Sequence, residues 1–296
     1  MLQLPAAERH VFIAVLVIFF ISSILAVRQL HRSDNKCRML LILLMAFAVS
    51  LQLFILVLRS IEIKAVPLSS LFDSMIVLSI AFGLTFIFLS FAIRQVWFSS
   101  VMIWFIFGLV LLTAFVASPA SQLQSFAKTP WVILHALSMA LSGTAIALSG
   151  ALAALFLITR RNLKSKRIAR VLGKMPNVEK LEFLNVIGIK VAFLLLTFGL
   201  ISGAAMAIVR SAEISISFYD WITDSKIILV MVAWLMLGGI LGLRQILKLR
   251  GRVVAQMTLV VGFLIIFAII GTTIFCATEH EFSEQRIEKS NSEVRQ

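Results

Sequence analysis

The chain has 296 residues, of which 60% are hydrophobic and 14% are charged, and its mean hydropathy is +1.04. A soluble globular domain carries about 25% charged residues, so this composition excludes one and indicates a protein that folds in the lipid bilayer. Lysine and arginine outnumber aspartate and glutamate by 27 to 14, which gives a formal net charge of +13. In a membrane protein such an excess reports orientation, and we expect a bilayer but no nucleic acid as a partner.

Eight segments are apolar enough to cross a bilayer, for which a helix needs roughly 20 residues. They cover residues 11–27, 39–58, 74–93, 96–117, 131–158, 186–209, 227–243 and 253–275. The first segment lacks a basic leader and a small-residue cleavage site, so we expect it to be retained. We therefore expect an all-α fold, a polytopic membrane helix bundle with about eight transmembrane helices in a single domain over residues 1–296.

Basic residues orient this predicted bundle, because Lys and Arg concentrate in cytoplasmic loops. Seventeen of them lie in the linkers on one side, which are residues 28–38, 94–95, 159–185 and 244–252. Nine lie on the other side, in residues 1–10, 59–73, 118–130, 210–226 and 276–296. We expect both termini outside a bacterial inner membrane, with a basic cytoplasmic linker at 159–185 and a polar outer tail at 277–296.

Two glycine pairs occur in the apolar segments, Gly199 with Gly203 and Gly238 with Gly242. A spacing of four residues places both glycines on one helix face, where a neighbouring helix can approach closely. We interpret both pairs as sites of close helix packing.

Three of the four histidines, His10, His135 and His280, fall at or near the predicted outer boundary. His135 and His280 should lie at similar depths, and neutral imidazole is a strong axial ligand for haem iron. Trp221 and its aromatic neighbours in the loop between them would provide a flat platform for a macrocycle. The alternative is that the histidines are simply solvated and that the tryptophan belongs to the aromatic belt of the membrane interface.

Asp73 and Asp224 each precede a predicted span, and Lys226 follows at the outer end of the seventh. A carboxylate at a helix start caps free N–H groups, which is the default interpretation for both aspartates. Lys226 is either a snorkelling anchor or a partner for a propionate carboxylate.

These residues resemble the cytochrome c assembly membrane proteins, a haem-handling family with CcsA-like and HemX-like branches. The family has an outer loop of the form WxWDPKE followed by a helix containing TW and WL, and WITDSKIILVMVAWL places Trp221, Asp224, Lys226 and Trp234 in register with it. WVILHALS and IFCATEHEF match the family's histidines before and after the loop, and PLSSLFDS resembles its PLSNLYES. The resemblance extends from about residue 67 to residue 282.

The resemblance implies that His135 and His280 are the axial ligands of the iron of a transiently bound haem b. Trp221, Asp224, Lys226 and Asp73 are then the other cofactor-binding residues. It also implies a partner, either a second membrane protein of cytochrome c maturation or apocytochrome c itself. No residue is dedicated to catalysis of the thioether step, so we expect an accessory subunit rather than a self-contained enzyme.

The chain departs from the family pattern at several positions. Thr223, Ser225 and Ile227 replace the second tryptophan, the proline and the glutamate of the loop, and Gly242 replaces an intramembrane histidine of the CcsA-like branch. The main hypothesis is a protein that presents haem at the outer surface in cytochrome c maturation. The alternative is a HemX-like regulator or scaffold of tetrapyrrole metabolism that no longer transfers haem. A small-molecule transporter ranks last, because the spans carry almost no charge.

Overall fold

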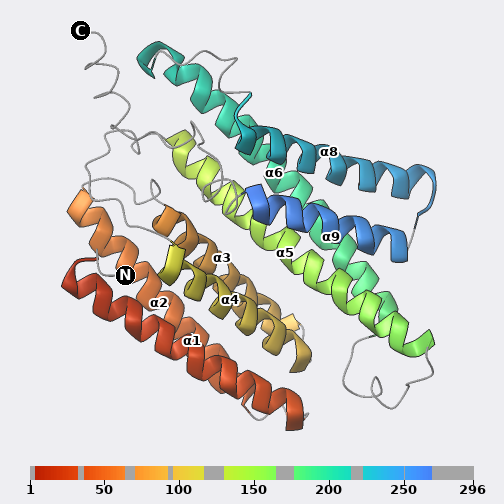
Figure 1. Cartoon of the computed structure of the whole chain (residues 1–296), viewed down its shortest axis with the longest axis horizontal. Coiled ribbons are helices and arrows are strands. Elements are labelled where there is room, and N and C mark those ends of the chain that lie inside the picture. Colours follow the sequence, from red (N-terminus) through yellow and green to blue (C-terminus); the bar gives the residue numbers. More distant parts are fainter. Residues whose placement is uncertain are drawn as a thin grey trace.

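The computed structural model describes residues 4–32, 37–63, 71–92, 96–116, 130–164, 177–214, 223–249 and 251–268, and most of these residues lie in helices (Figure 1). The helices are α1 (Ala6–Arg32), α2 (Arg38–Ile63), α3 (Leu71–Ala92), α4 (Val96–Val116), α5 (Pro130–Lys164), α6 (Val178–Ile214), α8 (Ser225–Ile246) and α9 (Arg252–Ile266). No strand occurs in the described ranges, and the predicted all-α membrane bundle is confirmed.

Seven of these helices are long and apolar enough to cross a membrane. The eighth, α9, is apolar over its 15 residues, and the end of its predicted span, together with the predicted outer tail, lies outside the described residues. The protein is therefore a multi-pass membrane protein. The third and fourth predicted spans are two separate helices, because α3 ends at Ala92 and α4 begins at Val96.

Consecutive helices run in opposite directions, so their ends collect at the two ends of the bundle (Figure 1). The start of α5 and the start of α8 lie at the end where α1 begins. The other end holds Arg160, Arg161 and Lys164 of α5, Lys180 of α6 and Arg252 of α9. The predicted orientation assumes that successive loops lie on alternate sides of the membrane, and the alternating helix directions agree with this assumption. The orientation in a membrane stays a prediction.

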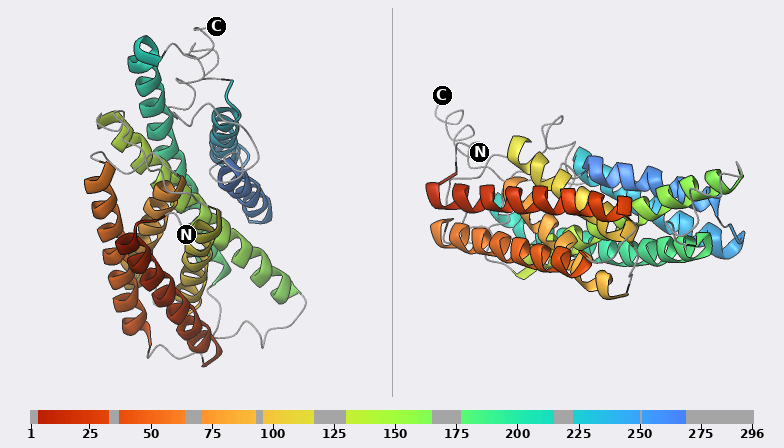
Figure 2. Two further views of the ribbon diagram at one scale, coloured as in Figure 1. Left: turned by 60° about the vertical axis from the view of Figure 1, so that its left-hand side comes forward. Right: turned by 90° about the horizontal axis from the view of Figure 1, so that it is seen from below.

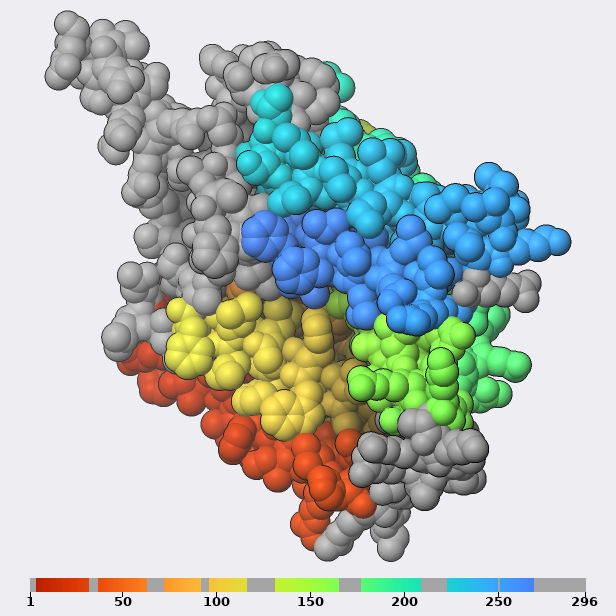
Figure 3. Space-filling model, turned by 45° about the vertical axis from the view of Figure 1, so that its right-hand side comes forward, coloured from red at the N-terminus to blue at the C-terminus, as the bar shows by residue number. Residues whose placement is uncertain are grey.

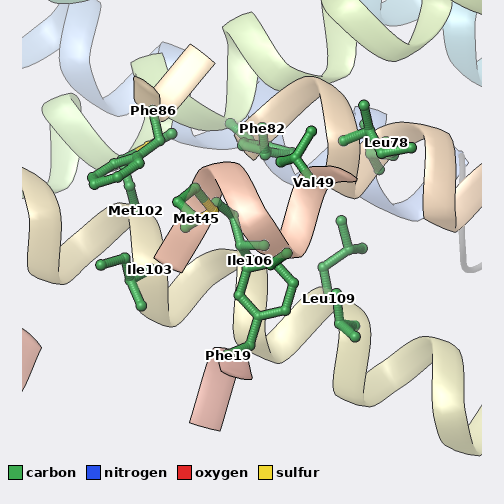
Figure 4. Close-up of a cluster of buried hydrophobic side chains, with 14 of the residues drawn as sticks. Phe19, Met45, Val49, Leu78, Phe82, Phe86, Met102, Ile103, Ile106 and Leu109 are labelled. Atoms are coloured by element: carbon green, nitrogen blue, oxygen red, sulfur yellow. The ribbon is translucent and has the colours of Figure 1, made fainter. Parts of the chain in front are cut away.

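The first four helices enclose one apolar core. Phe19 from α1, Met45 from α2, Phe82 from α3 and Ile106 from α4 are all at most 2% exposed, and Figure 4 shows side chains from all four helices turned toward one another. Full burial of such a side chain contributes about 1.5–3 kcal/mol in water, whereas within a membrane the tight packing itself is the main contribution. These helices form one half of the bundle.

Helix α5 lies between the two halves of the bundle, as the views in Figure 2 show. It contacts α3 on one side and α6 and α9 on the other, and its pairing with α6 is the most extensive in the molecule. A second core joins Ile146 of α5, Leu196 of α6, Leu237 of α8 and Val261 of α9. Figure 3 shows α8 and α9 side by side on one face, with α4 and α5 next to α9.

The long α5 and α6 have 35 and 37 residues and extend beyond the predicted spans. At about 1.5 Å per residue each exceeds 50 Å, against roughly 30 Å for the hydrocarbon core. Helix α6 begins where the Asn177 side chain accepts a hydrogen bond from the Glu179 amide. We therefore expect the ends of α5 and α6 to extend beyond the hydrocarbon core.

Close packing at glycine is confirmed at three of the four predicted positions. A Cβ on Gly199 would lie 2.7 Å from Met139 Sδ, and one on Gly203 would lie 3.0 Å from the His135 ring, both on α5. Gly238 packs in the same way against Phe193 of α6. For Gly242 the prediction is wrong, because a Cβ there would meet no atom within 4 Å.

Candidate functional site

The predicted ligand His135 lies in the second turn of α5 and faces α6. Its Nδ1 is 2.8 Å from the backbone carbonyl oxygen of Gly199, and its side chain is partly buried. A carbonyl oxygen only accepts hydrogen bonds, so this contact requires the proton on Nδ1. In that tautomer the lone pair lies on Nε2, which is the arrangement found when a histidine coordinates a metal through Nε2.

The missing side chain of Gly203 makes room for this imidazole. A Cβ at this position would lie 3.0 Å from His135 Cε1 and 3.1 Å from its Nδ1, which is closer than ordinary van der Waals contact. One turn earlier along α6, Gly199 accommodates Met139, which follows His135 by one turn of α5. Two adjacent gaps on α6 therefore receive two adjacent side chains of α5, and they fix the relative position of the two helices.

Helix α8 brings Lys226 to the same place. Asp224 is the N-cap of α8, and its Oδ1 accepts a hydrogen bond from the Lys226 amide at 2.8 Å. The Asp224 side chain is 8% exposed, and the Lys226 ammonium group lies within electrostatic range of the His135 imidazole. The capping interpretation of Asp224 is confirmed. Its cap also determines where α8 begins and so where Lys226 stands.

Trp234, which the resemblance places in register with the family, anchors α8 to α6. Its indole Nε1 donates to Thr197 Oγ1 at 2.8 Å, and its ring stacks on Phe193 with centroids 5.6 Å apart. Thr197 lies two residues before Gly199. The same segment of α6 therefore contacts the indole of α8 and the imidazole of α5.

Asp73 takes part in a different cluster, where the start of α1, the end of α2 and the start of α3 meet. Its Oδ1 accepts from Arg59 Nε at 2.5 Å, and the same guanidinium donates through Nη1 to Glu8 Oε2 at 3.2 Å. All three side chains are at most 3% exposed, and the guanidinium also lies over the Phe72 ring. Asp73 is therefore an ion-pair partner of a buried arginine, and its predicted contact with a cofactor stays a prediction.

Sequence reasoning missed Glu8 and Arg59 because it assigned both to outer segments outside the spans. The structure shows that α2 continues to Ile63, so Arg59 lies inside a helix. A signal was available, since an arginine near the end of an apolar run and two acids at similar predicted depth are all present. Sequence reasoning also missed Ser202, whose hydroxyl lies 3.0 Å from the Gly199 carbonyl oxygen.

The structure places Lys226, in the first turn of α8, within electrostatic range of His135 of α5, and Asp224 caps the same turn of α8. His280 and Trp221 lie outside the described residues. Within the part of the chain that the structure describes, no group of three His, Cys, Asp or Glu side chains is placed to hold a metal ion.

The family described as "Cytochrome C assembly protein" matches residues 68–277, which is more than half of the chain and includes α3 to α9. No curated protein matches significantly.

Proposed function

This chain belongs to the cytochrome c assembly protein family and so has a role in cytochrome c maturation, and we propose that it does so by binding haem where the outer ends of α5, α6 and α8 meet. In this proposal His135 is one axial ligand and His280 is the other. The observation that carries it is the hydrogen bond from His135 Nδ1 to the Gly199 carbonyl.

The donor set of the site suits haem better than a bare metal ion. Haem supplies four of its iron's ligands itself, so a single oriented histidine from the described residues is enough for one axial position. Metal-binding histidines almost always donate their other ring N–H to a carboxylate, a carbonyl or water, and His135 makes such a bond with Gly199. These features support His135 as a ligand through Nε2.

Lys226 and the loop before α8 complete the proposed site. An ammonium group close to the imidazole is suited to pair with a haem propionate, and Asp224 fixes the turn from which Lys226 extends. Trp221 would contribute a flat apolar surface to the macrocycle, and Asp73, which pairs with Arg59, would be a further contact. When bound, haem supplies the iron and the vinyl groups that maturation joins to apocytochrome thiols.

The chain's own residues bind and orient the cofactor in this proposal. We assign the thioether step to a partner, either a second membrane protein of the maturation system or apocytochrome c itself. The protein lies in a bacterial inner membrane, with the haem site on the outer side. The haem is haem b, held transiently.

A second candidate function is that of a HemX-like scaffold or regulator of tetrapyrrole metabolism. The observation that favours it is the first turn of α8, where Ile227 replaces the family's glutamate and is only 7% exposed. A buried isoleucine there has replaced a polar group of the haem-facing loop. The basic cytoplasmic residues between α5 and α6 would be its contact with a partner enzyme.

Hemin titration of the detergent-purified protein tests the proposal, with the Soret absorbance as the readout. We expect His135→Ala and His280→Ala each to weaken hemin binding about tenfold or more, since loss of even an outer-shell partner costs about 10–100-fold in metal affinity. His10→Ala is the matched control, because His10 is also near the outer boundary and its Nδ1 contacts the backbone oxygen of Ala6. Wild-type affinity in both test variants, or no binding by the wild type, would favour the scaffold function.

A further inference from the structure

The carbonyl of Gly199 is shared between two side chains. His135 Nδ1 lies 2.8 Å from this oxygen and Ser202 Oγ lies 3.0 Å from it. The Ser202 hydroxyl also lies 2.8 Å from the Phe198 carbonyl oxygen, and the side chain is 1% exposed. A hydroxyl has one hydrogen, so Ser202 donates to either Phe198 or Gly199 at any moment. Within α6 this carbonyl also accepts the backbone N–H of the next turn. In one arrangement the imidazole is the only one of the two side chains that donates to it, and in the other the Ser202 hydroxyl competes with the imidazole for the carbonyl's electron density.

We propose that Ser202 is a positioning residue for His135, whose hydroxyl sets the strength of the bond from His135 Nδ1 to the Gly199 carbonyl and thereby the electron density on Nε2. This inference rests on the proposed function, in which Nε2 coordinates the iron. Gly203 lets the His135 ring reach the Gly199 carbonyl, because a side chain at position 203 would push against the imidazole. The Gly199 carbonyl, the Ser202 hydroxyl and the missing side chain of Gly203, all within about one turn of α6, therefore act together on His135 of α5.

The direction of the effect follows from elementary acid–base chemistry. A stronger bond from Nδ1–H to an acceptor raises the basicity of Nε2 and favours ferric over ferrous iron. When Ser202 donates to Gly199, the carbonyl is a weaker acceptor for the imidazole. Ser202→Ala removes this competition, so the bond to His135 strengthens and the reduction potential of a bound haem shifts to more negative values.

The first arm of the test needs no haem. Nitrogen-15 NMR of histidine-labelled protein reports which ring nitrogen carries the proton, and His135→Gln identifies the signals of His135. We expect wild-type His135 to be protonated at Nδ1 only, and Ser202→Ala to move the Nδ1–H proton resonance downfield. Ser142→Ala is the control, since Ser142 also lies buried between α5 and α6 but donates to the Ala192 carbonyl, at 3.1 Å, rather than to Gly199.

The second arm is a redox titration of the haem-loaded protein. We expect Ser202→Ala to shift the potential negatively and Ser142→Ala to leave it unchanged. A proton on Nε2 in the wild type, or His135 signals that do not respond to Ser202→Ala, would overturn the inference. Failure of the wild type to bind hemin, with the NMR results as expected, would refute the proposed function while supporting the action of Ser202 on His135.

Discussion

Gly203 shows how strictly the packing around His135 depends on one residue. A valine here would place its Cβ about 3.0 Å from the imidazole before its two methyl groups are counted. We predict that Gly203→Val turns His135 away from Gly199, lowers hemin affinity about tenfold and destabilises the protein by about 1–3 kcal/mol through overpacking. Hemin titration and thermal unfolding in detergent measure the two effects.

Gly239→Val is the control for this prediction. Gly239 lies on α8, and a Cβ there would meet no atom within 4 Å. The valine at this position should leave hemin affinity unchanged. Equal behaviour of the two valine variants would show that the gap at Gly203 does not hold the histidine.

Arg59 forms ion pairs with two buried acids, Glu8 and Asp73. We predict that Arg59→Met destabilises the protein by about 3–5 kcal/mol, because it removes the cation that pairs with both buried carboxylates. The midpoint of unfolding in detergent is the measurement. Arg161→Met, at an exposed position of α5, should change it little.

A triple variant separates the loss of charge balance from the loss of packing. Glu8→Gln, Arg59→Met and Asp73→Asn together remove the three charges that form the two ion pairs, and replacing a whole buried ion group is often close to neutral. We expect the triple variant to recover much of the stability that Arg59→Met loses. If it is as unstable as the single variant, the ion pairs are not the cause.

Among the helices, α8 is attached to α6 by the Trp234 indole. We predict that Trp234→Phe costs about 0.5–1.5 kcal/mol, because it removes the bond to Thr197 while a ring remains to stack on Phe193. Thr197→Val removes the same bond from the other side. The free energies of unfolding of both single variants and the double variant form a cycle, and additive losses would contradict the bond.

The helices themselves were predictable from sequence because a bilayer demands long apolar runs, and each described helix contains or overlaps one of the eight predicted spans. Their lengths were not. Glu8 and Arg59 are charged, so hydropathy assigned them to loops, whereas ion pairing lets the ends of α1 and α2 keep them inside helices.

The candidate site was predictable in part. Histidine chemistry and the family resemblance pointed to His135, and capping chemistry pointed to Asp224, which the structure confirms as the N-cap of α8. The Gly199 carbonyl and the Ser202 hydroxyl were not predictable, because which backbone group meets the imidazole depends on how α5 and α6 pack.

For the whole molecule, the alternating helix directions predict which residues face each side of the membrane. In a variant with Cys37→Ser and Cys276→Ser, a cysteine at Ala7 should react with a membrane-impermeant maleimide added to spheroplasts, because α1 begins at the predicted outer end. A cysteine at Arg161 should react only after the membrane is opened. Both positions are exposed. The reverse pattern would place the histidine site in the cytoplasm.

The most direct test of haem ligation by His135 is the optical spectrum of the dithionite-reduced, haem-loaded protein. We predict a low-spin spectrum for the wild type, its loss in His135→Gly, and its return when imidazole is added to that variant to replace the missing side chain. A low-spin spectrum that persists in His135→Gly without imidazole would contradict the account, because the ligand would then come from another residue.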